Sequence, residues 1–109
     1  METEYTGKLI KIFIEGSDKY RHDLLYKSII EVLEKCEVSG ATVIRGIEGF
    51  GEEKKIHEDF LEVLSRNLPI VIEVAVKNEK VDEVIEKLSK MITSGKIVII
   101  DNVKMISFE

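Results

Sequence analysis

The pattern that most limits how this chain can fold is one that occurs twice along it. An apolar strand is followed by an amphipathic helical stretch, a Ser-Gly pair and a second apolar strand, first around Ser39-Gly40 and again around Ser94-Gly95. Each half has the order of a βαβ unit. Because crossovers are right-handed and each helix has to cover the sheet, we expect a ferredoxin-like α+β fold. This βαββαβ two-layer sandwich places both main helices on one face of a four-stranded antiparallel sheet.

The elements of the first half follow from hydrophobic periodicity. Three isoleucines alternate with other residues over 8–15, which predicts a strand. The Gly-Ser-Asp sequence that follows breaks the strand pattern and offers Ser17 or Asp18 as a helix N-cap. Apolar residues then recur at helical spacing, and we expect this helix to end near Glu37. A second strand is predicted over 41–47.

The second half repeats this order. A strand is predicted over 70–77, and Asn78 is expected to cap the next helix, which carries six apolar residues along one face. The last strand is predicted over 96–108. Asp101 and Asn102 interrupt its pattern, and these two side chains favour a turn or bulge.

The connection over 48–68 is long for so small a domain, because connections usually have roughly 4 to 6 residues. Part of it has the apolar spacing of a short helix. It is preceded and opened by Gly46, Gly49 and Gly51. Three glycines so close together indicate either a close approach of the backbone to a ligand or a bulge and tight turn. The sequence Ser94-Gly95-Lys96 has a similar ambiguity, since it fits a helix C-cap or a phosphate contact.

The strands are apolar on both faces, although two helices can cover only one. In the third and fourth strands, one face has Ile70, Ile72, Val74, Val76, Ile97 and Ile99, and the other has Val71, Ala75, Val98 and Ile100. When one face of an antiparallel sheet lies in water, apolar and polar residues normally alternate more regularly along its strands. We therefore expect oligomerisation, or a long connection that folds over the sheet.

Composition excludes several classes of protein. With 109 residues, 44% of them hydrophobic, the chain has room for one domain over 1–109. The net charge of -5 argues against nucleic acid and anionic membrane partners, and no apolar run is long enough for membrane insertion. Charges near the N-terminus are unlike a signal peptide, so we expect a cytoplasmic protein. The absence of Gln and the abundance of Glu, Lys and Ile are typical of thermophile proteins.

No catalytic residue is predicted. Cys36 lies on the apolar stripe of the first helix, where a small buried hydrophobe is the simplest interpretation. His22 is expected in the first turn of that helix, and His57 lies in the long connection. Neither histidine is close to the cysteine in sequence, so no nucleophile and base are paired, and no metal-ligand set can be assembled from Cys and His alone.

Three segments of the chain resemble a known family. The run over 40–51, the pair Ile56-His57 and the segment over 64–69 closely resemble a bacterial and archaeal family of uncharacterised PII-like proteins. The family is similar in turn to the PII signalling proteins. That resemblance implies ferredoxin-like subunits that assemble as trimers and bind an adenine nucleotide in clefts between subunits. It also implies that the connection over 48–68 reaches out to a regulated enzyme or transporter.

The chain departs from PII proteins at two places. Glu52 and Glu53 follow the glycines where PII proteins have an arginine and a glutamine that help to hold the nucleotide. The PII phosphate loop also has no close match over 100–104, where Lys104 is the available counterpart. Carboxylates repel phosphates, so the resemblance implies that ADP or AMP fits this chain as readily as ATP.

Two hypotheses follow from the resemblance. The leading one is a non-enzymatic signalling protein, a homotrimer that binds an adenine nucleotide. Its candidate ligand-binding residues are Arg45, Gly49, Phe50, Gly51, Gly95, Lys96 and Lys104. The alternative is a ligand-free protein–protein interaction module that acts through the connection over 48–68.

Overall fold

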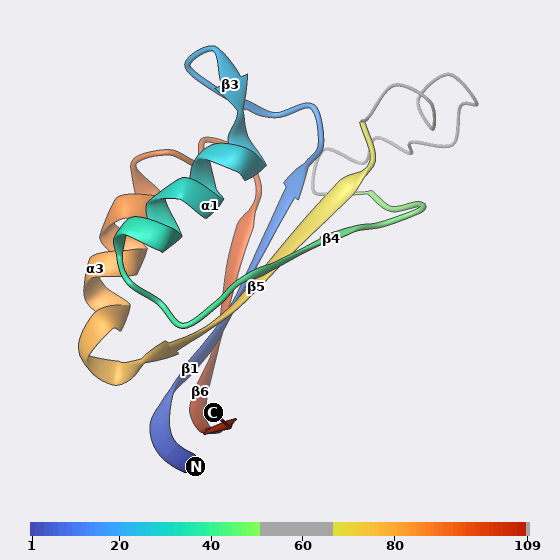
Figure 1. The fold of residues 1–109 in the computed structure, drawn as a ribbon. Helices are drawn as coiled ribbons and strands as arrows, with labels where there is room; N and C mark the ends of the chain where they lie inside the picture. Colours follow the sequence, from blue (N-terminus) through green and yellow to red (C-terminus); the bar gives the residue numbers. More distant parts are fainter. Residues whose placement is uncertain (51–66, 109) are drawn as a thin grey trace.

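The computed structural model describes residues 1–50 and 67–108 and shows two layers (Figure 1). One layer is a four-stranded antiparallel sheet in the order β4-β5-β1-β6, and both main helices lie on one of its faces. This confirms the ferredoxin-like architecture expected from the sequence. The elements of this sandwich are β1 (Glu2–Glu15), α1 (Leu25–Lys35), β4 (Thr42–Arg45), β5 (Pro69–Lys77), α3 (Asn78–Ser89) and β6 (Lys96–Phe108).

The core lies between the helices and the inner face of the sheet. Alternate residues of β1 and β5 point inward, and the helices contribute residues at three- and four-residue spacing. The largest fully buried side chains are Ile10, Ile12, Ile29, Leu33, Ile70, Ile72, Val74, Val76, Val84, Leu88 and Cys36. Protein cores are closely packed, so these side chains tolerate little change in volume. The core therefore determines how the helices pack on the sheet.

The central strand β1 is longer than its sequence pattern indicates. It begins at Glu2, six residues before the predicted start, because its first residues pair with the end of β6 from Gly7↔Val103 to Glu2↔Phe108. β5 pairs with β1 only as far as Gly7. The first residues of β1 and the last of β6 therefore continue as a two-stranded ribbon beyond the four-stranded sheet (Figure 1).

A β-bulge interrupts β6 where the sequence predicts one. Lys8 of β1 lies opposite two residues of β6, Asp101 and Asn102, and the register shifts there. Asn102 has a φ of 56°, in the left-handed region that asparagine tolerates better than most residues. The Lys8 ammonium forms an ion pair with the Asp101 carboxylate across this point.

The predicted N-cap of the first helix is wrong. Between β1 and α1 the chain forms a small hairpin of β2 (Lys19–Tyr20) and β3 (Asp23–Leu24), and α1 starts only at Leu25 without a side-chain cap. Asp18 instead accepts a hydrogen bond from the backbone N–H of Glu15 at 3.0 Å, and the hydroxyl of Ser17 bonds Asn67. Both polar side chains therefore stabilise the turn after β1 and not the helix.

Two further details of the helices differ from expectation. His22 lies exposed in the turn of the β2–β3 hairpin and not in the first turn of a helix. The N-cap of α3 is Lys77, and Asn78 is its first helical residue, with its side-chain amide 3.5 Å from the Thr6 hydroxyl. The short helix expected within 48–68 lies outside the described residues.

The sheet face that the helices leave uncovered, called here the outer face, is largely apolar. By register and alternation it consists of Leu9, Lys11, Phe13, Thr42, Ile44, Val71, Glu73, Ala75, Lys96, Val98 and Ile100. Four of its large side chains remain between 36% and 45% exposed. This agrees with the surplus of apolar strand residues seen in the sequence, and it makes the outer face a candidate interface.

The bulge gives a first testable prediction. Asn102→Val should lower the free energy of unfolding by about 1–2 kcal/mol, because a β-branched residue is strained at positive φ. Asn102→Gly is the matched variant, and it should unfold close to the wild type. Urea denaturation of all three proteins at one protein concentration measures this. Equal stability of the valine variant would show that residue 102 is not held in the left-handed region.

Candidate functional site

Two glycines near the start of the long connection, Gly46 and the candidate Gly49, pack closely on Pro69, the first residue of β5. The backbone N–H of Gly46 donates to the carbonyl oxygen of Pro69 at 2.7 Å. A Cβ atom on Gly46 would lie 2.9 Å from Cγ of Pro69, and one on Gly49 would lie 3.2 Å from the same atom. Both glycines therefore have a structural reason for their lack of a side chain: they let the chain leaving β4 fold back against β5.

Gly95 is required by the backbone at the start of β6. Its φ is +127°, and a Cβ atom there would lie 2.5 Å from the carbonyl oxygen of Phe13. α3 ends at Ser89 with its C-cap at Lys90, so Gly95 is not the C-cap of that helix, as one interpretation of the sequence had it. The glycine brings the turn before β6 close to the end of β1 and places Lys96 directly after it.

Arg45 ends β4 and lies on the helix side of the sheet. It pairs in register with the buried Ile70, and its guanidinium carbon lies 5.7 Å from the centre of the Tyr26 ring of α1. This cation–π contact orients an otherwise long and flexible side chain. Phe50 is 73% exposed, so this side chain is not part of the core.

The structure brings some of the candidate residues to one end of the sheet and leaves others apart. Arg45, Gly49 and Gly95 lie at the end where β4 and β1 finish and β6 begins. Arg45 and Lys96 nevertheless lie on opposite edge strands, β4 and β6. These two strands are three strand spacings apart, which is roughly 14 Å.

One described candidate lies elsewhere. Lys104 pairs with Thr6 in the ribbon, roughly 25 Å along β6 from Lys96. Gly51 lies outside the described residues. The described candidates of one chain therefore do not form a single site for a small ligand.

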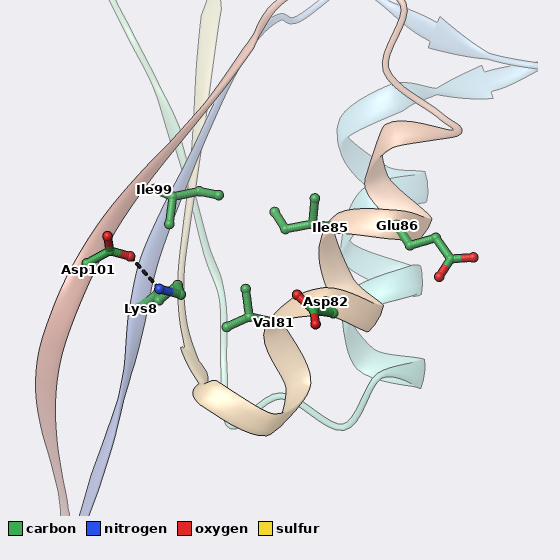
Figure 2. Close-up of a pocket in the computed structure, with 7 residues that line it drawn as sticks. All are labelled: Lys8, Val81, Asp82, Ile85, Glu86, Ile99 and Asp101. Carbon is green, nitrogen blue, oxygen red and sulfur yellow. Dashed lines mark hydrogen bonds and ion pairs between the residues drawn. The ribbon is translucent and has the colours of Figure 1, made fainter.

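A separate pocket of about 540 Å³ lies between α3 and β6 on the helix side of the sheet (Figure 2). Its lining residues are Lys8, Val81, Asp82, Ile85, Glu86, Ile99 and Asp101. None of the candidate ligand-binding residues is among them. Its one cation, Lys8, is already paired with Asp101, and Glu86 points away from that pair. With three carboxylates and one ammonium, the pocket is electrostatically unsuited to phosphate.

The buried cysteine has the properties of a core residue. Cys36 is fully buried at the end of α1, and burial raises the pKa of its thiol, which disfavours the nucleophilic thiolate. Its carbonyl oxygen accepts a hydrogen bond from the Lys80 ammonium at 2.9 Å. In residues 1–50 and 67–108, no three His, Cys, Asp or Glu side chains are grouped so that they could hold a metal ion.

Within the same described ranges, no helix is long and apolar enough to cross a membrane.

The glycine contacts give a second prediction. Gly95→Ala should lower the free energy of unfolding by about 1–3 kcal/mol, because the new methyl group meets the Phe13 carbonyl and positive φ is strained for alanine. Gly40→Ala is the matched control: nothing lies within 4 Å of its added Cβ, so its effect should stay within about 0.5 kcal/mol. Chemical denaturation of both variants compares them, and an undiminished stability of Gly95→Ala would contradict the backbone requirement.

The fold is shared with PII-like proteins of known structure. CPII from Thiomonas intermedia K12, a nitrogen regulatory PII-like protein bound to ADP, AMP and bicarbonate, superposes with a TM-score of 0.67 at 20% identity, covering 94% of this chain and 98% of that one. PII of Arabidopsis thaliana bound to citrate superposes with a TM-score of 0.58 at 20% identity, covering 89% of this chain and 78% of that one. At these identities the likeness shows the fold, which is PII-like.

Sequence similarity defines the family more narrowly. A UPF0166 protein of Methanocaldococcus jannaschii is 37% identical over 94 residues, which is 86% of each chain. The family model DUF190, described as Uncharacterized ACR, COG1993, matches residues 7–105. The match includes both main helices, β4 and β5, and all of β1 and β6 except the first five residues of β1 and the last three of β6. The chain therefore belongs to the DUF190 family, which confirms the resemblance to an archaeal and bacterial family of PII-like proteins.

Proposed function

We propose that this chain is a non-enzymatic PII-like signalling protein that binds an adenine nucleotide in clefts between the subunits of a homotrimer. The observation that carries the proposal is the PII-like fold, which extends over 94% of the chain and is shared with CPII, a protein solved with ADP and AMP. The connection over 48–68 would be the segment that acts on a regulated enzyme or transporter.

The positions of the candidate residues support a site between subunits. Because neighbouring strands of the sheet are antiparallel throughout, its two edge strands, β4 and β6, run in opposite directions. A second copy can therefore set its β4 beside β6 with the strand directions still alternating. Arg45 and Gly49 of one copy then approach Gly95 and Lys96 of the next, which unites groups that one chain keeps roughly 14 Å apart.

The outer face supports the assembly. A ring of copies joined by their sheet edges can turn the outer faces inward, where the exposed side chains of Phe13, Ile44, Val98 and Ile100 are removed from water. The hydrophobic effect then favours the trimer. It also makes the cleft at the sheet edge a property of the assembly, because each cleft needs two neighbouring copies.

The charges near this cleft set the class of nucleotide. Arg45, on the helix side of the sheet, and Lys96, on the opposite side, supply two cations that would flank phosphate oxygens at the joined edges. Glu52 and Glu53 follow the glycines in sequence and oppose a highly charged ligand. We infer that ADP and AMP bind at least as tightly as ATP.

Calorimetric titration tests the nucleotide. ADP or AMP should bind the wild type, and Arg45→Ala and Lys96→Ala should each weaken binding at least about tenfold, since each removes a charged hydrogen bond worth about 1.5–3 kcal/mol. Lys27→Ala is the matched control: this lysine is exposed on α1 and lies outside the candidate site. Absence of heat with ATP, ADP, AMP and cyclic AMP at millimolar concentration would remove nucleotide binding from the proposal.

Sedimentation equilibrium tests the assembly. The protein should sediment at three times the 12.4 kDa mass of one chain. A monomer across the micromolar range would contradict a site shared between subunits, because no single copy brings the candidate residues together.

A second candidate function is supported by two exposed side chains at the start of the long connection. Ile47 is 89% exposed and Phe50 is 73% exposed. Two apolar side chains in such positions favour a ligand-free interaction module that holds a partner protein through the connection over 48–68. In this case Ile47→Ser and Phe50→Ser would release a captured partner while ADP and AMP change nothing, whereas the leading proposal requires capture to respond to nucleotide.

A further inference from the structure

A tyrosine of α1 lies beside the candidate arginine at the end of β4. The guanidinium carbon of Arg45 lies over the Tyr26 ring, 5.7 Å from its centre. Tyr26 is the second residue of α1, and its partly buried side chain packs against the core. Arg45 is exposed on the edge strand of the sheet. The contact therefore joins the helix layer to the one arginine among the candidate ligand-binding residues.

Both residues of this contact have a fixed backbone. Next to Tyr26 in α1, Leu25 is 2% exposed and Ile29 is 0% exposed, so the start of the helix is anchored in the core. Arg45 pairs in register with Ile70, which is 1% exposed. The part of the contact with the most freedom is the Arg45 side chain, whose rotatable bonds cost conformational entropy whenever the side chain becomes ordered.

The chemistry of the contact leaves the arginine able to bind an anion. The face of an aromatic ring attracts a cation but does not accept a strong hydrogen bond. A guanidinium has several N–H donors and no acceptor, so a ring that attracts its charge does not use up these donors. A carboxylate in the place of Tyr26 would compete with phosphate, because it binds the same N–H groups. An aromatic partner therefore suits an arginine that binds phosphate.

A purely structural role explains less of this contact. An exposed cation–π pair contributes little to the stability of a chain in water. The packing of Tyr26 against the core uses its apolar body, which leucine or methionine could also supply. Neither of these side chains has a ring face that attracts a cation. The ring is therefore better explained by its effect on Arg45 than by core packing.

We propose that Tyr26 is a positioning residue for the nucleotide phosphates: it holds the Arg45 guanidinium ready at the cleft and does not itself touch the ligand. This inference rests on the proposed function and deepens it, because it names a residue that sets the affinity for the charged part of the nucleotide. When Tyr26 holds Arg45 before binding, the conformational entropy of the arginine is lost on folding and not on binding. The nucleotide then binds more tightly to the same charged group.

Three variants test the proposal by calorimetric titration with ADP. Tyr26→Leu removes the ring and should raise the Kd about three- to tenfold, because Arg45 must then be ordered on binding. Tyr26→Phe keeps the ring face and should bind ADP within about twofold of the wild type. In an Arg45→Ala background, Tyr26→Leu should cause no further loss, because the ring acts through the guanidinium.

The outcomes separate a positioning role from other roles of the tyrosine. A Tyr26→Leu variant that binds ADP as tightly as the wild type would overturn the proposal. A loss that persists in the Arg45→Ala background would overturn it as well, because Tyr26 would then act on the ligand or on the fold without the arginine. So would weak binding by Tyr26→Phe, since the proposal invokes the ring and not the hydroxyl. If circular dichroism shows that Tyr26→Leu does not fold, Tyr26→Met replaces it in the same titrations.

A matched control exists in the ribbon formed by β1 and β6. Tyr5 is also partly buried, and the Lys77 ammonium lies 4.0 Å from the centre of its ring. It is roughly 30 Å along β1 from Ile14, the residue level with the end of β4. Tyr5→Leu removes a ring from a cation–π contact that does not involve Arg45, and it should leave the Kd for ADP unchanged.

Failure of this inference and failure of the proposed function give different results. A wild type that binds no adenine nucleotide refutes the proposed function and this inference with it. A wild type that binds ADP, together with a Tyr26→Leu variant that binds it equally well, refutes this inference and leaves the proposed function intact.

Discussion

The structure depends on one imbalance: the strands are apolar on both faces, and two helices cover only one of them. The inner face forms a dry core with α1 and α3. The outer face keeps large side chains such as Phe13, Ile44 and Ile100 partly in water. Covering it releases water from apolar surface, which is the main favourable contribution to most protein associations. Because the apolar surplus lies on the sheet, any assembly that relieves it also determines which loops and edges of neighbouring copies meet.

Close backbone contacts position the candidate residues. Gly46 and Gly49 pack against Pro69, and Gly95 packs against the Phe13 carbonyl. These contacts explain the glycines without a ligand, so the glycines alone are not a nucleotide-binding signature. They also place the ends of β4 and the start of β6 at one end of the sheet. Arg45 and Lys96 lie at this end on opposite edge strands, so the proposed site requires a second copy.

Local sequence signals predicted the repeated elements and the bulge well, since periodicity and turn chemistry act over a few residues. The bulge at Asp101 and Asn102 is the clearest case. The helix caps were less predictable. Ser17 and Asp18 are good capping residues, yet the β2–β3 hairpin intervenes and both stabilise a turn. Local preference for a cap was outweighed by contacts between segments far apart in the chain, as the bond from Ser17 to Asn67 illustrates. For the same reason, the sequence suggested candidate residues by their type but could not predict the distances between them.

The sequence by itself determined the order of the four sheet strands and the two main helices, the two apolar faces of the sheet and the family, because these depend on residue pattern along the chain. Only the tertiary structure decided that Lys11 meets Glu73 on the outer face, that Arg45 stacks on Tyr26, and that Lys104 lies far from Lys96. The physical reason is strand register. Pairing between β1, β5 and β6 joins residues separated by tens of positions, and a shift of one residue would exchange every inward side chain for an outward one.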